Sequence, residues 1–356
     1  MIEVISLSGM LVMLILAYRG ERAYRSLPVL TALKARNKLP SLSIIIPARN
    51  EAHHLPKLLG SLRELRYPGE LEIIVVDDNS TDSTAQVAAE NGAVVLPTPE
   101  LPDGWLGKPH ACERGAQAAR GEFFLFTDAD TLHAPQSAGV AVACVLEHDL
   151  DGLSMFLQQQ THSIIDGSTL ALAFAGLYAG RGARAGLLNG QYILLSRRAY
   201  FGSGGFARVR DHPLEDVALG KELERAGYRV ALMRGQAWAS VQMYQGLPQL
   251  WNGLTRLGSG ALGETGRAAW LTVLFVTLCA LPLILAAPFW MDHRAFLWLL
   301  VWGSAAVTCL PWARRVGSVG LCLLAPPAAM LMIAAAVSGI IQRFTKRGNL
   351  WKGRRV

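Results

Sequence analysis

Acidic side chains follow two apolar runs of the sequence at the points where those runs end. Asp77-Asp78 closes one run, and Asp128-Ala-Asp130 closes the other. An Asp-x-Asp pair at the end of a strand spreads two carboxylates around a hard cation such as Mg²⁺ or Mn²⁺, whose other ligands are waters and substrate phosphates. Carboxylates gathered at one edge repel each other unless a cation or a donor satisfies them. The pattern therefore favours a divalent metal ion at Asp128 and Asp130 over a turn of solvated aspartates.

Two further charged positions stand at the starts of predicted helices. Gly107-Lys108 opens a helix predicted over 108–120, and a helix N-terminus with a lysine is a phosphate site in physical terms. Glu215-Asp216 opens another helix, where the helix dipole favours acids. A carboxylate at such a place also serves as a general base that takes a proton from a hydroxyl group. A solvated lysine and simple N-terminal charges are the alternatives at the two positions.

Strands and helices alternate along residues 41–267, and this alternation predicts how those side chains are positioned. Unbroken apolar runs indicate buried strands, and the segments between them have helical apolar spacing. We expect parallel, right-handed βαβ units in an open α/β sheet, with ligands bound beyond the carboxyl ends of the strands. The acidic pairs, together with Asn50-Glu51, all fall at such ends. The predicted strands are 42–47, 71–77, 94–95 and 122–127, and the predicted helices between them are 51–66, 83–91 and 108–120.

Apolar residues are concentrated in segments outside that region. Hydrophobic residues make up 51% of the 356-residue chain and charged residues 17%, fewer than the roughly 25% of an average soluble domain. Residues 4–18 are apolar and three arginines follow them, which predicts an uncleaved anchor with its N-terminus outside. Such a segment reaches about 22 Å, so it spans with the help of its flanks or lies tilted in the interface. Three later stretches are long enough to span, namely 269–291, 295–313 and 316–342.

The charges at the C-terminal end conflict with four membrane crossings. If the middle region is cytoplasmic and every segment spans, the basic tail ends outside, against the positive-inside rule. Pro326-Pro327 near the centre of 316–342 favours a re-entrant hairpin or an interfacial helix pair, and the rival repair is that 4–18 does not span. The sequence predicts a multi-pass protein of the cell membrane whose parts are an anchor over 1–25, a cytoplasmic catalytic domain over 40–267, membrane helices over 268–342 and a basic cytoplasmic tail over 343–356 that contacts membrane lipids.

Charge and cysteine usage exclude two classes of protein. The net charge is +7, but the basic residues flank apolar segments and do not interleave with aromatic residues, so nucleic-acid binding is disfavoured. The number of cysteines, five, is odd, and the sequence has no Cys-x-x-Cys motif. Both observations exclude a disulfide scaffold and a clustered zinc site. The Ala/Gly-rich stretch 171–186 fits an interfacial helix or a packed internal helix equally well. Nothing in the sequence names a protein partner.

Several motifs occur in a fixed order across residues 40–235. They are Pro47-Ala-Arg49-Asn50-Glu51, Asp77-Asp78-Asn-Ser-Thr-Asp82, Gly107-Lys108, Asp128-Ala-Asp130, and Gly204-Gly205-Phe206 through Glu215-Asp216. Together they resemble family 2 glycosyltransferases of the GT-A fold, whose core is a Rossmann-like, mainly parallel α/β sheet. The loop 101–108 and the C-terminal segment 351–354 narrow the resemblance to one subgroup of the family, the membrane-bound enzymes associated with carotenoid and hopanoid glycosylation.

The resemblance implies a role for each matched residue. In the family, Asp77 and Asp78 reach the uracil and the ribose, and Lys108 contacts the nucleotide or its phosphates. Asp128 and Asp130 hold the sugar and the metal-bound diphosphate. The full set implied to bind the nucleotide sugar is Pro47, Arg49, Asn50, Glu51, Asp77, Asp78, Lys108 and Asp128.

The implied reaction is inverting transfer of a hexose from a nucleotide sugar, with UDP-glucose as the expected donor. Asp216, with Glu215 beside it, is the implied base, and Mg²⁺ or Mn²⁺ on Asp130 and Asp128 is the implied cofactor. The implied acceptor is a lipid such as a carotenoid or another terpenoid at the cytoplasmic face of the membrane. A polyprenyl-phosphate sugar synthase and a non-catalytic protein that binds nucleotide or lipid are the alternatives, and the intact carboxylates argue against the second.

The sequence departs from many relatives after the base. Those relatives carry Gln-x-x-Arg-Trp, whereas this chain has only the degenerate Gln249-Leu-Trp251-Asn with Arg256 nearby. Processive polymer synthesis is therefore disfavoured, and the residues that bind the acceptor are not identified by the motif.

Overall fold

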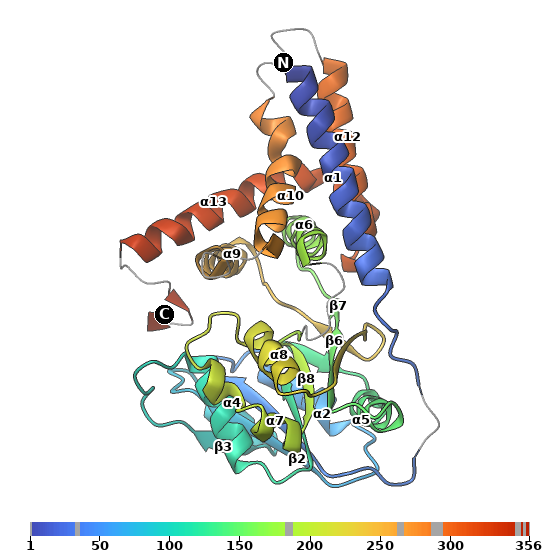
Figure 1. The fold of residues 1–356 in the computed structure, drawn as a ribbon. Coiled ribbons are helices and arrows are strands. Elements are labelled where there is room, and N and C mark those ends of the chain that lie inside the picture. The colour runs from blue at the N-terminus through green and yellow to red at the C-terminus, as the bar shows by residue number, and fades with distance from the viewer. Residues whose placement is uncertain are drawn as a thin grey trace. The chain divides into compact units, whose positions relative to one another are not determined.

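The chain forms two compact units, whose elements are labelled in Figure 1. The computed structural model describes residues 2–32, 36–181, 188–261, 267–285, 295–345, 350–351 and 354–355. The sheet unit comprises residues 28–158 and 185–241. The helical unit comprises residues 1–27, 159–184 and 242–356. The segment 159–184, which lies inside the predicted catalytic range, thus groups with the helical unit.

A seven-stranded sheet forms the core of the sheet unit. Its strands and the shorter ones are β1 (Leu42–Ala48), β2 (Leu71–Asp77), β3 (Val94–Pro97), β4 (Phe123–Thr127), β5 (Thr131–His133), β6 (Gly152–Phe156), β7 (Gln158–Gln159), β8 (Tyr192–Ser196), β9 (Val230–Arg234) and β10 (Ala239–Val241). The strand order is β3-β2-β1-β4-β8-β6-β9. β1 to β4 pair in parallel, as the sequence predicts, while β8 runs antiparallel to both β4 and β6. β5 pairs antiparallel with β10.

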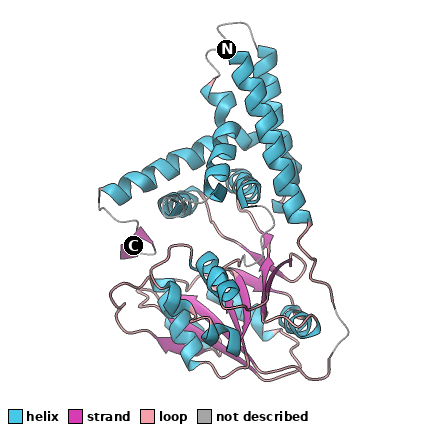
Figure 2. Ribbon diagram, viewed as in Figure 1, coloured by secondary structure: helices cyan, strands magenta, loops and turns pink. Residues whose placement is uncertain are grey.

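Helices pack on both faces of this sheet (Figure 2). They are α2 (Leu55–Arg63), α3 (Thr84–Glu90), α4 (Gly107–Ala118), α5 (Ser137–Glu147), α7 (Arg197–Gly202), α8 (Glu215–Arg225) and the 3₁₀ turn η1 (Phe206–Val209). The predicted helices and strands recur with ends shifted by a few residues, because their apolar faces are buried as the spacing requires.

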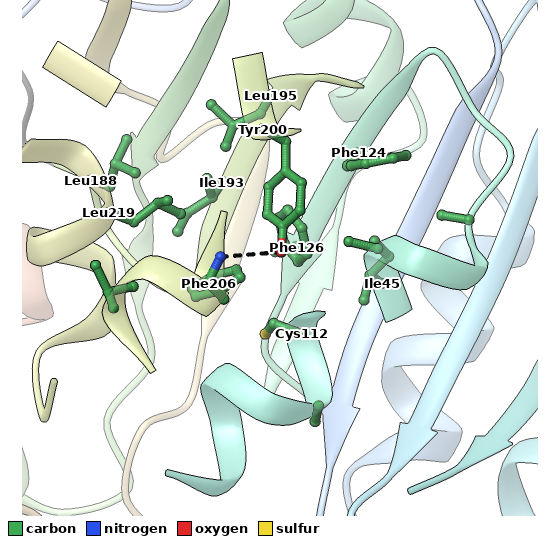
Figure 3. Close-up of a cluster of buried hydrophobic side chains, with 14 of the residues drawn as sticks. Ile45, Cys112, Phe124, Phe126, Leu188, Ile193, Leu195, Tyr200, Phe206 and Leu219 are labelled. Carbon is green, nitrogen blue, oxygen red and sulfur yellow. Dashed lines mark hydrogen bonds between the residues drawn. The ribbon is translucent and has the colours of Figure 1, made fainter. Parts of the chain in front are cut away.

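An apolar cluster fixes α4 and α8 against the strands. Figure 3 shows Ile45 and Phe126 of the sheet facing Cys112 of α4 and Phe206 of η1. Tyr200 of α7 lies inside the cluster, and its hydroxyl accepts a hydrogen bond from the Phe206 amide at 3.2 Å. The same hydroxyl donates to the buried Glu113 carboxylate of α4 at 2.6 Å. This packing holds the first turns of α4 and α8, where the predicted lysine and base stand.

The helical unit consists of long apolar helices. They are α1 (Ile2–Arg25), α6 (Ile164–Arg181), α9 (Leu247–Ala261), α10 (Arg267–Ile284), α12 (Ala295–Val316), the 3₁₀ segment η2 (Val319–Leu324) and α13 (Ala325–Phe344), followed by the short strands β11 (Leu350–Trp351) and β12 (Arg354–Arg355). The 24 residues of α1 extend about 36 Å, which exceeds the bilayer core of about 30 Å. The helix is longer than the apolar segment 4–18 because it continues through the three arginines, and its bounds lie within the anchor predicted over 1–25.

Small residues bring α1, α6 and α10 close together. A side chain at Gly20 would lie 2.8 Å from the Ala179 backbone of α6, and one at Gly9 would lie 3.0 Å from Leu281 of α10. Gly176 of α6 faces α10 in the same way. Such contacts are typical of helices that pack without a hydrophobic driving force between them. The predicted stretch 171–186 is therefore a packed helix as far as residue 181, and its remainder lies outside the described residues.

An ion pair and two aromatic rings join the C-terminal ends of α1 and α12. The Arg315 guanidinium donates two hydrogen bonds to the Glu21 carboxylate, each 2.7 Å long. It also lies 4.0 Å from the centre of the Tyr24 ring and 4.7 Å from that of Trp312. These contacts place the C-terminal ends of α1 and α12 side by side, so the two helices end on the same side of the unit (Figure 1).

The structure corrects the prediction of a hairpin or helix pair centred on Pro326-Pro327. Residues 325–344 form one continuous helix, α13, and the two prolines occupy its first turn, where the missing N–H groups cost nothing. α13 contacts α9, α10 and α6, and it runs across the direction of α1 and α12 (Figure 1). Among the described residues, three helices are long and apolar enough to span a membrane, namely Glu3–Arg25, Ala295–Val316 and Val319–Gln342.

Candidate active site

A recess opens in the sheet unit at the carboxyl ends of β1 and β4. It collects residues from these strands, from the first turns of α4 and α8, and from the loop before β8. Such a position at the strand ends is the expected ligand site of an open α/β sheet. The lining residues are Pro47, Lys108, Cys112, Phe126, Thr127, Asp128, Gly190, Ile193, Phe206, Glu215 and Asp216.

Lys108 is the central cation of the recess. Its Nζ lies 2.7 Å from Asp128 Oδ1 and 3.2 Å from Glu215 Oε1. Burial acts to lower the pKa of Lys108, but the two carboxylates outweigh it and hold the pKa well above its ordinary value. The lysine therefore stays charged. It links Asp128, the acid at the end of β4 that is predicted to bind the donor, with Glu215 at the start of α8.

Asp216 is held by two backbone amides. The Gly190 N–H donates to Oδ2 and the Val217 N–H donates to Oδ1, both at 2.8 Å. Burial, and then the charge of Glu215, raise the pKa of Asp216, while Lys108 opposes that rise. A raised pKa makes the carboxylate a stronger base than a solvated aspartate, and the two amides fix its orientation. These are the properties required of a general base.

The turn after β4 provides the two carboxylates predicted to bind metal. Asp128 is engaged by Lys108, whereas Asp130 Oδ1 is buried and has no hydrogen-bond partner in the part of the chain that the structure describes. Burial, and then the charge of Asp128, raise the pKa of Asp130 to about 7. An orphaned hard oxygen beside a second carboxylate fits Mg²⁺ or Mn²⁺, which takes few protein ligands and completes its shell with water and phosphate. Within the described ranges, no three acidic, histidine or cysteine side chains group as a metal site.

The loops after β1 and β2 are tied to each other. Arg49 Nη1 donates to the carbonyls of Asp78 and Asn79, at 2.5 and 2.9 Å. Asn50 has a φ of 53°, and its side-chain oxygen accepts a hydrogen bond from the Thr81 amide at 2.8 Å. The predicted nucleotide-binding string after β1 therefore supports the loop that carries the second acidic pair.

The remaining acids of these loops also make bonds within the chain. Nδ1 of His54 lies within hydrogen-bond distance of Glu51 Oε2, at 2.7 Å, and the Ser80 amide donates to Asp77 Oδ1 at 3.3 Å. Asp78 is 2% exposed and lies near the Thr98 hydroxyl. Of this region only Pro47 lines the recess, so the nucleotide-binding roles of Arg49, Asn50, Glu51, Asp77 and Asp78 stay predictions.

Gly190 is a site residue that the sequence motifs do not reveal. A Cβ atom there would lie 3.2 Å from Lys108 Nζ and 3.3 Å from Asp216 Oδ2, so any other residue would crowd both groups. The one signal in the sequence is the turn-forming pair Asn189-Gly190. The degenerate acceptor motif lies elsewhere, on α9 of the helical unit, where Trp251 packs in an apolar cluster with Leu250.

Comparisons with known proteins match this site and fold to one family. A model described as glycosyl transferase family 2 matches residues 43–160. The 4,4'-diaponeurosporenoate glycosyltransferase of Staphylococcus haemolyticus is 30% identical over 254 residues, covering 67% of each chain. Its namesake in Staphylococcus aureus is 31% identical over 239 residues, covering 63% of this chain and 62% of the relative. The mannosyltransferase PcManGT of Pyrobaculum calidifontis, solved with GDP-Man and Mn²⁺, is 20% identical with a TM-score of 0.63, covering 96% of this chain and 99% of that one.

The chain belongs to glycosyl transferase family 2. Membership confirms the enzyme class predicted from the motifs, a glycosyltransferase. The likeness to PcManGT confirms the predicted fold, a mainly parallel α/β sheet of the GT-A kind with apolar helices at both ends of the chain. The alignments span about two thirds of the length of the curated relatives.

Proposed function

We propose that this protein is an inverting glycosyltransferase that moves a hexose from a nucleotide sugar, with UDP-glucose as the expected donor, to a terpenoid lipid of the carotenoid type. The observation that carries the proposal is the position of Lys108 between Asp128 and Glu215, beside the oriented carboxylate of Asp216. A cation for phosphates and a base for an acceptor thus share one recess. The names of the two staphylococcal relatives support the choice of acceptor.

On the donor side, Lys108 pairs with the diphosphate and leaves Asp128 free to bind the sugar or a metal ion. A bound Mg²⁺ or Mn²⁺ supplies positive charge that stabilises the departing diphosphate. Asp128 and Asp130 are the residues that would hold it, since one oxygen of Asp130 is buried without a partner in the described part of the chain. The side chains at the ends of β1 and β2 are proposed to bind the nucleoside.

On the acceptor side, Asp216 takes the proton of the attacking group. A hydroxyl acceptor needs this base, because an alcohol is a poor nucleophile until its proton is removed. The acceptor in the relatives' name is a carboxylate, which attacks without losing a proton. The dependence of turnover on Asp216 should therefore differ between the two kinds of acceptor, and that difference identifies which one the enzyme uses.

The helical unit is proposed to hold the enzyme at the membrane where its lipid acceptor resides. α1 and α12 would cross together with the 18-residue α10, although α10 is not among the three described helices long enough to span by themselves. α13 is long enough to span, but it lies across α1 and α12 and would rest in the cytoplasmic interface. Three crossings from an outer N-terminus leave Arg22, Arg25, Arg314 and Arg315 and the tail in the cytoplasm, in agreement with the positive-inside rule. This arrangement resolves the conflict of four crossings without discarding the N-terminal anchor.

Turnover by membranes that contain the full-length protein tests the proposal. We expect nucleotide release from UDP-glucose, or from another sugar nucleotide in a panel, together with a new glycolipid from a terpenoid lipid extract. Both should require Mg²⁺ or Mn²⁺ and be lost on chelation. With a hydroxyl acceptor, Asp216→Asn should lower turnover about 10²- to 10⁴-fold, the usual contribution of a general base.

The control is Asp211→Asn, which removes an exposed aspartate from the loop before α8 and should leave turnover unchanged. A product that alkali cleaves is an ester of a carboxylate acceptor, and for it the Asp216 variant should lose little activity. The absence of turnover with every sugar nucleotide would contradict the proposal. An alkali-stable product formed equally well by the Asp216 variant would contradict the role of the base.

A further inference from the structure

Beneath the turn that carries Asp128 lies a buried polar cluster that the proposed mechanism does not use. It consists of Thr127 at the end of β4 and of Thr131 and His133 on β5, all of them at most 5% exposed. His133 Nε2 lies 3.1 Å from the Thr127 hydroxyl and 3.3 Å from the Thr131 hydroxyl. The two hydroxyl oxygens are 2.8 Å apart. Buried polar groups this close must share protons, so the count of protons decides what the cluster does.

Each hydroxyl also has a backbone carbonyl to which it can donate its proton. Thr127 donates to the carbonyl of Gln191 at 3.0 Å, and Thr131 donates to the carbonyl of Asp128 at 2.7 Å. Each hydroxyl has one proton, so neither is left for the contact between the two oxygens. Two oxygens at 2.8 Å without a shared proton would repel each other. When both hydroxyls donate to the carbonyls, the two oxygens need a donor from outside the pair, and Nε2 of His133, 3.1 and 3.3 Å from them, is placed to supply it.

This requirement fixes the tautomer of His133. Burial lowers the pKa of the ring to about 4, so the imidazole is neutral and carries one proton. An N–H at Nε2 can donate to the hydroxyl oxygens, and Nδ1 then carries only a lone pair. Nδ1 is buried without a partner in the described part of the chain, which fits an atom that has no proton to donate. A proton on Nδ1 would instead bury an unpaired donor and make Nε2 compete with two carbonyls for two hydroxyl protons, which is the costlier arrangement.

The two carbonyls held in this way belong to the two sides of the recess. Asp128 carries the carboxylate that pairs with Lys108. Gln191 follows Gly190, whose amide donates to Asp216 Oδ2 at 2.8 Å. If the Nε2 proton is lost, one hydroxyl must turn to the other, and one of the two carbonyls is released. The donor turn or the loop that orients the base then loses an anchor.

We propose that His133, as the neutral tautomer protonated on Nε2, is a positioning residue that fixes the Asp128 turn and the loop before β8 through the hydroxyls of Thr127 and Thr131. The proposal rests on the proposed function, because it assigns the cluster to the alignment of donor and base. It adds a residue that touches no substrate and lies outside every motif of the sequence.

Two substitutions separate the donated proton from the bulk of the ring. In His133→Gln, the side-chain amide nitrogen can take the place of Nε2 and keep an N–H donor, so most turnover should be retained. In His133→Phe, the ring volume stays and the donor is lost. We expect this variant to turn over roughly 10- to 100-fold more slowly at saturating nucleotide sugar, the range found when supporting hydrogen bonds around a site are removed.

The matched control is Tyr228→Phe, which removes an exposed hydrogen bond from the Tyr228 hydroxyl to the carbonyl of Arg198, neither of which lines the recess. Its turnover should equal that of the unchanged protein. Thermal unfolding of all three variants shows whether a loss of turnover reflects a loss of folded protein. Equal losses in the Gln and Phe variants, or a Phe variant no slower than the control, would overturn the proposal.

Nitrogen NMR of the full-length protein labelled with ¹⁵N-histidine gives a readout that does not depend on activity. The chain has eight histidines, and the signals missing from His133→Gln identify His133. We expect a protonated Nε2 and an unprotonated Nδ1 that stay unchanged across neutral pH. A proton on Nδ1 would overturn the proposal even if turnover is found. Absence of turnover in the unchanged protein, with the expected tautomer present, would count against the proposed function alone.

Discussion

At the scale of single residues, Lys108 lies between two carboxylates and is the cation that we propose binds the anionic donor. Without a donor it pairs with Asp128 and Glu215. A diphosphate brings two or more negative charges to the same ammonium group. Lys108 must therefore give up its ion pairs with Asp128 and Glu215 in order to pair with the donor. Asp216 then loses part of the positive field that keeps its pKa from rising further. The lysine thus links occupancy of the donor site to the strength of the base.

This link predicts a shift in the pH profile of Lys108→Met. Asp216 acts on a hydroxyl acceptor only when ionised, so kcat/KM falls as the pH drops through its raised pKa. The charged groups that face Asp216 are Glu215, which raises that pKa, and Lys108, which lowers it. Removing the lysine should therefore move the acid limb to higher pH. It should also lower kcat/KM by about 10- to 100-fold, the value of a hydrogen bond to a charged group.

The measurement is kcat/KM for the nucleotide sugar across pH, with Lys57→Met as the control for loss of one exposed lysine charge. An unchanged profile in the Lys108 variant would show that the lysine does not act on the base. A shift to lower pH would contradict the sign of the electrostatic argument.

The sequence predicts site residues that stand at the ends of elements, and it misses those brought in by tertiary contact. Lys108, Asp128 and Asp216 can be identified because each follows a buried strand or begins a helix, positions with a fixed direction in an α/β sheet. Gly190 cannot, because its partner lies many residues away along the chain, and the role of His133 cannot, because it depends on a distant contact of its neighbour Thr127. Gly190 meets Asp216 across 26 positions, and Thr127 meets the Gln191 carbonyl across 64.

At the scale of elements, the strands and helices of the sheet unit could be predicted from apolar periodicity, whereas α13 could not. β1 is buried along nearly all of its length and β2 at its centre, and both contain long apolar runs, so their bounds are nearly those predicted. The prediction of a break at Pro326-Pro327 was wrong because proline can interrupt a helix and can equally occupy its first turn. The apolar composition of 316–342 is the same in either case. Only the contacts of α13 with α9 and α10 distinguish them.

The crosswise position of α13 predicts that the C-terminal tail is cytoplasmic. A helix of that composition resting in the interface leaves both of its ends on one side of the membrane. A single cysteine appended to the C-terminus should therefore escape a membrane-impermeant thiol reagent in intact cells and react in inverted vesicles. The five native cysteines are buried, which keeps the background low.

The control for that labelling is a cysteine added before Met1, which should react in intact cells because the N-terminus is expected outside. Labelling of the C-terminal cysteine in intact cells would show that α13 crosses the membrane. Protection of both termini would instead show that α1 does not cross, the rival reading of the charge pattern.

At the scale of the whole molecule, the chain combines a sheet unit, which we propose carries the chemistry, with a helical unit, which we propose contacts the membrane. α6 follows β7 and precedes β8 along the chain, so an apolar helix of the helical unit is inserted between two segments of the sheet unit. A search of the sequence for membrane spans leaves this insertion in the soluble part, because its apolar helix is shorter than a span. Its membership in the helical unit follows from packing against α1 and α10.

The central claim is that one recess performs a single displacement at the anomeric carbon, with Asp216 on the side opposite the departing diphosphate. The most direct measurement is the anomeric configuration of the glycolipid formed from an α-linked sugar nucleotide, read by NMR of the isolated product. The account predicts inversion to a β-linked sugar. An α-linked product would mean retention, and it would contradict both the proposed mechanism and the role assigned to Asp216.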